Sequence, residues 1–421
     1  MIKIFLILML TITSVYATNF DGHIVKLKSG SKSITFPESV KGMSSISTSF
    51  GKFYHVIASN NSLEQISKNS NVEYIEPNWI IKLDEKLNIL ENQTTTDAKF
   101  SQQWGFKNTG RNIGSRFKRG KAGEDVNALK AWTIQKGSKD IIIAVIDTGI
   151  DYKHSDLKDN MWTNQLEKDG VPGVDDDGNG YIDDIHGYDF SNNDGDPMDD
   201  YSHGTHCAGN IGASHNGKGT MGMMANVSLM AMKFLSKKGE GTIFQAIKST
   251  NYAMENGAKI MSNSWGMYEF SRTMKLAIQA ARDKNILFVA SAGNNTSDND
   301  MFEVYPARYN VDNVIAVGAM SGNGKIAKFS NFGKNTVHIF APGENIMSTM
   351  IHNRYKSKSG TSMAAPIVTG ALGLLLSNEP NISYKDAKER LIKTSMNSSL
   401  YTNLAQGGRL DAYRLLTNEQ R

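Results

Sequence analysis

The sequence predicts an α/β protein in which a doubly wound, mostly parallel sheet is covered by helices and preceded by a small α+β unit. Beyond residue 98, short apolar runs alternate with helix-like segments, as in buried parallel strands joined by crossover helices. Before residue 84, strand-like runs occur together with one polar stretch that fits a helix. The expected sheet strands are 141–146, 227–234, 258–261, 286–290 and 314–317, and the expected helices are 242–256, 271–284, 371–376 and 383–395.

Length and composition agree with this prediction and exclude several other classes. A chain of 421 residues with 39% hydrophobic and 21% charged residues, and a mean hydropathy of -0.38, is neither disordered, collagenous nor a multi-span membrane protein. A net charge of +4 is too small to indicate a nucleic-acid partner. The single cysteine, Cys207, excludes an intramolecular disulfide, so an exported form needs packing, metal ions or both for stability.

The first 17 residues have the pattern of a secretory signal peptide. Lys3 supplies a positive start, residues 4–10 form an apolar core, and Val-Tyr-Ala at 15–17 resembles a cleavage site after Ala17. The alternative is a membrane anchor, but the apolar run is shorter than the ~20 residues of a spanning helix. We therefore expect a secreted protein, extracellular or periplasmic, without a stable membrane anchor.

The segment that follows predicts a separate N-terminal unit. Strand-like runs at 21–27 and 53–57, together with a possible helix at 62–68, indicate a small α+β fold. The polar stretch 91–97 has no periodicity and is typical of an exposed, cleavable linker. A domain boundary near residue 95 follows, which divides the exported chain into 18–95 and 96–421.

The first of three chemistry-bearing segments ends the apolar run 141–146 in Asp147, followed by Thr-Gly. The carboxyl edge of an open parallel sheet is where α/β folds place their sites. The residues alone leave a cap or turn role open. They also leave open an aspartic protease, which would need a homodimer because the chain has no second Asp-Thr-Gly or Asp-Ser-Gly.

The second segment is Ser-His-Gly-Thr-His-Cys-Ala-Gly at 202–209. Its small residues allow a helix to start close to a neighbouring strand, and the start of this helix would present His203. His203 and His206 are spaced i, i+3, so a zinc pair is conceivable, although the glutamate of His-Glu-x-x-His is missing. One of the two histidines is expected to be structural.

The third segment is Ser-Gly-Thr-Ser-Met-Ala-Ala-Pro at 359–366, just before the apolar helix 371–376. A helix N-terminus offers unpaired N–H groups for a developing oxyanion, so Ser362 is a candidate nucleophile. The alternative is an ordinary serine N-cap. A reactive serine also needs a base and a carboxylate that orients it, and His203 and Asp147 can supply both.

Together these segments resemble the subtilisin-like serine proteases, the subtilases, with the chain order Asp, His, Ser. The resemblance covers about residues 98–415. The cysteine at position 207 resembles the proteinase K and thermitase branches of the family. It implies a serine endopeptidase that acts through an acyl-enzyme, with Ser362 as nucleophile, His203 as general base and then acid, and Asp147 orienting the imidazole.

The resemblance also implies the residues that bind substrate and oxyanion. Asn294, in Ser-Ala-Gly-Asn at 291–294, is the expected oxyanion donor, which would act together with the Ser362 N–H group. A protein or peptide substrate would lie as an extended strand along the edge 263–266. A preference for basic residues through Glu269 stays open. The expected substrate-binding residues are Ser264, Trp265, Gly266, Ala292 and Gly293.

Residues 20–82 are similar to the inhibitor-type propeptide of this family. The resemblance implies that the chain is made as a zymogen, in which its own propeptide assists folding and blocks the cleft until it is removed. A permanent extra domain is the alternative. We expect no other stable partner, and therefore a monomer.

Residues 169–200 contain eleven aspartates and neither lysine nor arginine, a density that indicates a bound cation. Three of them, together with Asn179 and Gly180, have the spacing D-x-D-x-N-G-x-x-D of part of an EF-hand loop, but position 12 is His186 rather than glutamate. Asp189 or Asp194 is a further candidate ligand, and a solvated acidic loop is the alternative. The expected calcium ligands here are Asp175, Asp177, Asn179, Asp183 and Asp184.

A second structural calcium site is implied by the family resemblance. Its expected ligands are Asp156, Asn216 and either Asp97 or Gln103. Calcium bound only by the folded state would stabilise a chain without disulfides. A non-catalytic, calcium-binding relative of the subtilases is the rival function.

Overall fold

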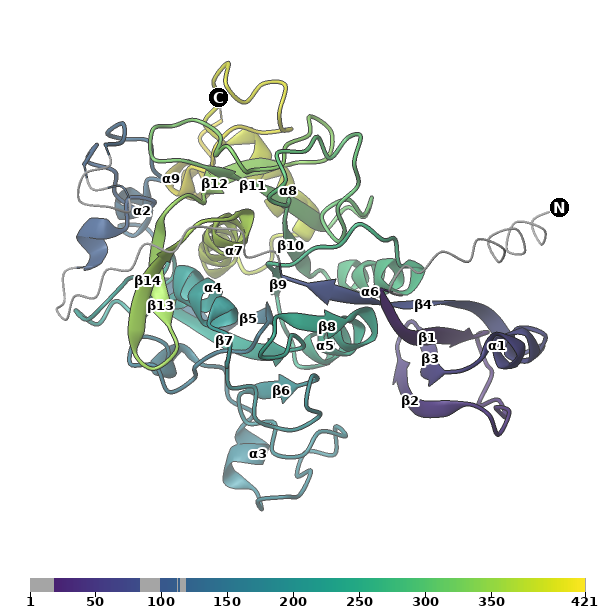
Figure 1. Cartoon of the computed structure of the whole chain (residues 1–421). Coiled ribbons are helices and arrows are strands. Elements are labelled where there is room, and N and C mark those ends of the chain that lie inside the picture. The colour runs from purple at the N-terminus through teal and green to yellow at the C-terminus, as the bar shows by residue number, and fades with distance from the viewer. Residues whose placement is uncertain (1–18, 84–98, 112, 114–118, 421) are drawn as a thin grey trace.

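The structure, a computed structural model, describes residues 19–83, 99–111, 113 and 119–420. The expected signal peptide and the expected boundary near residue 95 lie outside these residues. Figure 1 shows a small N-terminal sheet, in purple, beside a larger helix-covered sheet, with the last strand of the small unit running toward the larger one. The predicted α/β fold is confirmed, and so is an α+β unit before it.

The N-terminal unit is an antiparallel sheet with one helix on its face. Its strands lie in the order β2-β3-β1-β4, and the alternation of β1 places Val25 and Leu27 against Ile66 of the helix. Ser59 caps that helix by accepting the N–H group of Ser62. The elements are β1 (Phe20–Leu27), β2 (Lys41–Thr48), β3 (Gly51–Ile57), α1 (Asn60–Ser67) and β4 (Val72–Lys82).

The larger unit is built on a seven-stranded sheet in the order β12-β11-β10-β9-β5-β7-β6, in which every pair of neighbours is parallel. The apolar runs expected as strands all lie in it. From β5 the chain builds β6 and β7 on one side and then β9 to β12 on the other. The strands are β5 (Gly137–Asp147), β6 (Gly187–Asp189), β7 (Asn226–Lys233), β9 (Ile260–Asn263), β10 (Leu287–Ser291), β11 (Val314–Met320) and β12 (Ile339–Pro342).

Both faces of this sheet are buried, which explains why its strands are apolar throughout. In β5, Ile143 and Val145 pack with the core under α4 (His203–Gly212) and α7 (Thr361–Asn378). Ala144 and Ile146 point the other way, into the core under α5 (Ile243–Glu255) and α6 (Arg272–Asp283). Period-two alternation along one strand therefore supplies two separate cores.

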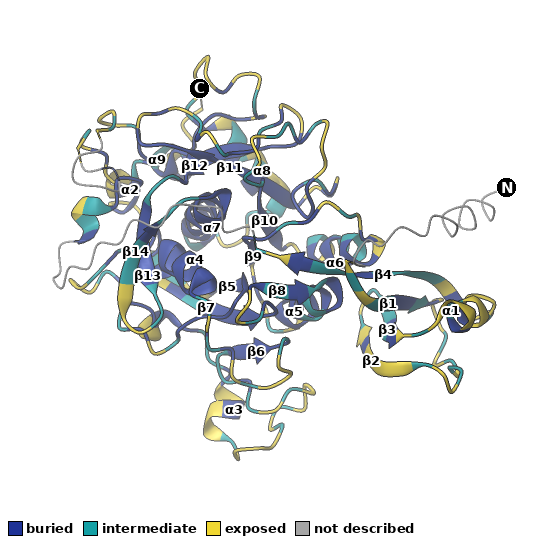
Figure 2. Cartoon of the chain, in the orientation of Figure 1, coloured by how far each residue is buried: buried dark blue, intermediate teal, exposed yellow. Residues whose placement is uncertain are grey.

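Helix α7 is the buried centre of the molecule. Figure 2 shows it dark blue, enclosed by the other elements. Within the described ranges it is the one helix long and apolar enough to cross a membrane, but 89% of its apolar window is buried inside the protein. It is therefore a core helix.

The remaining elements complete the surface around the two cores. The hairpin of β13 and β14 packs on α4, and α9 packs against α2 and α7. The elements are α2 (Ala128–Ala131), α3 (Gln165–Asp169), β13 (Ile346–Met350), β14 (Arg354–Lys358), α8 (Tyr384–Lys393), α9 (Ala412–Thr417) and two 3-10 turns, Lys99–Gln102 and Lys158–Asn160.

The two units are joined by a strand pair. The short strand β8 (Glu240–Thr242) of the large unit pairs antiparallel with β4, so Ile80 lies opposite Thr242 and Lys82 opposite Glu240. The small sheet therefore continues into the large unit at the point where α5 begins.

Candidate active site

Asp147 is the last residue of β5. This strand lies between β7 and β9, where the chain changes from building one side of the sheet to building the other. Asp147 is fully buried. One carboxylate oxygen accepts the Thr148 N–H group at 2.7 Å, and the two oxygens lie 2.7 and 2.9 Å from His203 Nδ1. The carboxylate thus fixes the imidazole with Nδ1 as donor and Nε2 as acceptor.

His203 begins helix α4, which lies unusually close to the end of β5. A Cβ atom at Gly204 would lie 2.1 Å from the carbonyl oxygen of Gly149, so only glycine permits this approach. Burial alone lowers the pKa of His203, but the Asp147 carboxylate and Cys207 outweigh it and raise that pKa well above 6.5. The protonated form of His203 is therefore stabilised.

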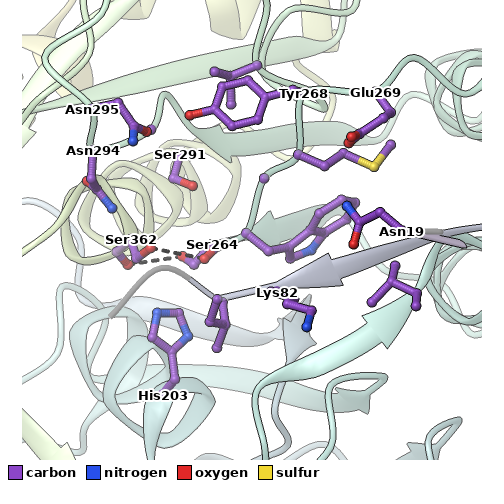
Figure 3. A pocket seen from close by; sticks show the side chains of 17 residues that line it. Asn19, Lys82, His203, Ser264, Tyr268, Glu269, Ser291, Asn294, Asn295 and Ser362 are labelled. Carbon is purple, nitrogen blue, oxygen red and sulfur yellow. Dashed lines mark hydrogen bonds between the residues drawn. The ribbon is translucent and has the colours of Figure 1, made fainter. Parts of the chain in front are cut away.

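Ser362 is the second residue of α7, whose N-cap is Gly360. It lines a cleft of about 250 Å³ together with His203 and Asn294 (Figure 3). Its hydroxyl donates to the carbonyl oxygen of Ser264 at 3.0 Å. Within the described part of the chain, no hydrogen bond joins the Ser362 hydroxyl to His203.

Asn294 follows β10, and its side-chain oxygen accepts two hydrogen bonds from Thr361, from N–H at 2.9 Å and from Oγ1 at 3.0 Å. This pairing assigns the amide orientation, because an NH₂ group there would face two donors. Figure 3 shows the amide nitrogen on the side of Ser362. The preceding Gly293 has φ +105°, and a Cβ there would lie 2.5 Å from Asn331 Nδ2, so this turn requires glycine.

Four of the five residues expected to bind substrate line the cleft: Ser264, Trp265, Gly266 and Gly293. Ala292 does not, because it is fully buried in a cluster with Phe340 and Tyr401. Trp265 is also buried and packs on Phe234, with ring centroids 5.3 Å apart, so it contributes mainly backbone to the cleft. Glu269 lies at the rim and is partly exposed.

The cleft is partly filled by the N-terminal unit. Ile80, Lys82 and Leu83 line it, and the Leu83 N–H group donates to the carbonyl oxygen of Gly239 at 2.9 Å. The extended segment at the end of β4 therefore lies in the same cavity as Ser362 and His203. Sequence analysis missed its partner strand, β8, which has only three residues and no periodicity.

The alternative of a zinc pair is not supported by the geometry. His206 Nε2 lies 3.0 Å from the carbonyl oxygens of both Ile346 and Lys356, and burial lowers the His206 pKa to about 3. Cys207 Sγ is 3.9 Å from His203 Nδ1, and with Asp147 these groups could in principle surround a metal. Burial raises the pKa of the Cys207 thiol, however, whereas a metal binds the thiolate.

The acidic loop brings three carboxylates together. Ligand oxygens of Glu167, Asp175 and Asp177 lie within 4.8 Å of one another. Glu167 was not predicted, because it precedes the loop in α3. Asn179 lies beside this group and donates to Asp177 at 2.9 Å, whereas Asp183 accepts the Gly173 N–H group at 2.8 Å.

Asp184 is turned to the interior. Its carboxylate accepts hydrogen bonds from Tyr252 of α5 and from Asn164, and burial raises its pKa. It anchors the acidic loop to α5. The three-carboxylate group consists only of oxygen donors, which suits calcium.

The residues expected at the second calcium site lie around the loop 216–222. One oxygen of Asp156 accepts the Thr220 N–H group at 2.9 Å, and the other is buried without a partner among the described residues. The Gln103 side chain pairs with the backbone of Met221 at 2.8 and 2.9 Å, and Asn216 is exposed. Asp97 lies outside the described residues. The unpartnered oxygen of Asp156 is compatible with a cation.

Comparison with known proteins agrees with the site geometry. The model of the "Subtilase family" matches residues 138–414. A thermophilic serine proteinase of Bacillus sp. (strain AK1) is 34% identical over 358 residues, which cover 84% of this chain and 75% of that protein. Subtilisin-like protease 1 of Plasmodium falciparum (isolate 3D7) is 38% identical over a region that covers 58% of this chain and 38% of that protein. Subtilisin-like protease 2 of Plasmodium falciparum is 35% identical over a region that covers 60% of this chain and 18% of that protein. The chain thus spans less than half of these two parasite relatives.

Proposed function

Because the chain belongs to the subtilase family and is a serine endopeptidase, we propose that it is secreted as a zymogen and cleaves protein or peptide substrates with Ser362, His203 and Asp147. The observation that carries the zymogen proposal is the Lys82–Leu83 segment, which lies in the cleft beside Ser362.

In the proposed cycle, Ser362 Oγ attacks the scissile carbonyl carbon while its proton moves to His203 Nε2. The new oxyanion accepts hydrogen bonds from Asn294 Nδ2 and the Ser362 N–H group. His203 then protonates the leaving amine, the C–N bond breaks, and water hydrolyses the acyl-enzyme by the same route. Ser362 must first turn from the Ser264 carbonyl toward His203, a rotation about one bond.

The N-terminal unit fits the role of an inhibitor and folding aid. Glu76 accepts three hydrogen bonds from the first turn of α6, from Ser271 Oγ, Arg272 N and Thr273 N, at 2.9 to 3.1 Å. Asn78 accepts the Phe244 N–H group at the start of α5. The unit therefore caps the two helices that cover one face of the central sheet, which supports assistance in their assembly.

We further propose that calcium stabilises the enzyme. Glu167, Asp175 and Asp177 would hold one ion and Asp156 a second one, with bound calcium supplying charge neutralisation for these carboxylates. The signal-peptide pattern of residues 1–17 supports export without a membrane anchor. We propose that the mature enzyme is a monomer.

Intact-mass analysis after treatment with a serine-directed fluorophosphonate tests the proposal, with Ser362→Ala in parallel. We expect one adduct on Ser362, none in the variant, and a wild-type chain that has lost the N-terminal unit while the variant retains it. Absence of an adduct on folded, calcium-loaded protein would overturn the assignment of Ser362 and favour the non-catalytic calcium-binding role. An adduct on wild-type protein that retains the N-terminal unit would instead refute only autoprocessing.

A further inference from the structure

The residue before His203 has an unfavourable backbone conformation. Ser202 has φ +83°, in the left-handed region that non-glycine residues rarely adopt, and it is the N-cap of α4. Its side chain makes no capping hydrogen bond. Such strain persists only where the surroundings determine the conformation. Some other group must therefore hold this turn and, with it, the start of the helix that presents His203.

That group is Asp199, a buried carboxylate four residues before His203. One of its oxygens accepts the N–H groups of Tyr201 and Ser202 at 2.9 and 2.8 Å. The other accepts N–H and Oγ1 of Thr205 at 2.9 and 2.6 Å. The carboxylate thus supplies the cap that Ser202 does not, and it binds residues on both sides of His203.

Asp199 is also connected to the strand that ends in Asp147. Thr148 Oγ1 donates to Asp199 at 2.9 Å and accepts the Gly204 N–H group at 2.8 Å. The Thr148 N–H group donates to the Asp147 carboxylate. A continuous chain of hydrogen bonds therefore runs from Asp147 through Thr148 and Asp199 to the turn on either side of His203.

We propose that Asp199 is a positioning residue for catalysis, which sets the distance and angle between the His203 imidazole and the Asp147 carboxylate through Ser202, Thr205 and Thr148. This inference rests on the proposed role of His203 as the base. The role that we propose is more than a contribution to stability. The five groups that donate hydrogen bonds to Asp199 all belong to the two segments that carry His203 and Asp147, and to no other part of the described cleft.

The Asp199→Asn variant tests this, because an amide at this place would turn an NH₂ group toward N–H or hydroxyl donors on one of its two sides. The turn at Ser202 should relax and His203 should shift. A displacement near 1 Å can cost about 100-fold in rate. We expect kcat to fall about 10- to 100-fold per titrated active site while KM changes less than twofold.

The assay uses the mature enzyme, processed in trans by a tagged wild-type protein that is then removed, and counts active sites by fluorophosphonate labelling. This normalisation separates positioning from stability, since a loss of folded protein lowers the number of sites and not kcat per site. Asp411→Asn is the matched control. Asp411 is also a buried carboxylate that caps a helix, α9, but it lies away from the cleft, so its variant should melt earlier with kcat per site unchanged.

Thr148→Val provides a second arm in case Asp199→Asn does not fold. It removes the hydroxyl that bridges Asp199 and Gly204, and kcat per site should fall about tenfold, again with KM unchanged. If every folded variant of Asp199 and Thr148 keeps wild-type kcat per site, the residues serve stability alone and the proposal is overturned. Full activity in His203→Ala would instead refute the proposed base, which distinguishes the two failures.

Discussion

The side-chain oxygen of Asn294 accepts two hydrogen bonds from Thr361, the residue that immediately precedes Ser362. Two segments far apart in the sequence, the turn after β10 and the start of α7, are thereby held together on one side of the cleft. Because the oxygen is held by Thr361, the amide nitrogen of Asn294 points to the side of Ser362. The proposed oxyanion donor is thus positioned before any substrate binds.

Asn294→Ala should therefore lower kcat with little change in KM. Removing one oxyanion donor costs about 100- to 1,000-fold in rate, or about 2.7–4 kcal/mol in transition-state stabilisation. Michaelis kinetics on a peptide substrate measure this. Thr361→Val keeps the Asn294 amide but removes one of the two hydrogen bonds that hold its oxygen, the one from Thr361 Oγ1, so we expect a smaller fall in kcat. Equal kcat values in Asn294→Ala and wild type would rule out Asn294 as the donor.

The pH dependence of activity should reflect the Asp147–His203 pair. The general base must be neutral, and the pKa of His203 is raised well above 6.5, so kcat/KM should rise with pH with a midpoint above 6.5. In Asp147→Asn the anion is gone and burial lowers that pKa, so the midpoint should move down while kcat falls about 10⁴-fold. A midpoint that is the same in both proteins would contradict this assignment.

The same pKa shift makes a prediction about stability. A histidine whose pKa is higher in the folded than in the unfolded state stabilises the fold fully below the unfolded value near 6.5, and this contribution disappears as the pH rises through the folded value. In a Ser362→Ala background, which prevents self-digestion, the melting temperature lost on Asp147→Asn should be largest below pH 6.5 and shrink in alkaline buffer. A difference that grows with pH would refute the predicted sign.

The chemistry of the candidate site was accessible from sequence because its residues follow strongly patterned elements. Asp147 ends an apolar strand, and Ser362 starts a helix too apolar to be exposed, so their elements were predictable. In a parallel sheet the carboxyl ends of the strands lie at one edge, so Asp147 after β5 and Asn294 after β10 are at the same edge, with β9 between their strands. The motif resemblance then specified their roles.

Features that depend on tertiary pairing were missed. The strand β8 has three residues, and nothing in them predicts a partner in the N-terminal unit. Glu167 joins the acidic cluster only because the loop folds back over α3. The family resemblance implies that Ala292 lies at the cleft, but a side chain in a strand-to-turn segment can face either way, and here it faces the interior.

Calcium removal should destabilise the enzyme. An ion that binds only the folded state adds about 2.7 kcal/mol at 100 times its dissociation constant. Excess EDTA should therefore lower the melting temperature of the Ser362→Ala protein, and Asp177→Asn should reduce that shift. Asp169→Asn is the matched control, because Asp169 is an exposed carboxylate of the same loop whose side chain pairs with Gln165. Unchanged melting in excess EDTA would exclude structural calcium.

The contact between the N-terminal unit and α6 should be measurable in the chain that keeps this unit. Glu76→Ala leaves three donors in the first turn of α6 without their acceptor, and loss of a helix cap costs about 0.5–2 kcal/mol. In the Ser362→Ala background, which we expect to retain the N-terminal unit, the free energy of unfolding should fall by about that amount. Glu64→Ala is the control, because Glu64 is exposed on α1 and its carboxylate pairs with Lys68 of the same unit. An exposed i, i+4 pair contributes little to stability, so a loss in Glu64→Ala as large as in Glu76→Ala would show that the cap does not stabilise the contact between the two units.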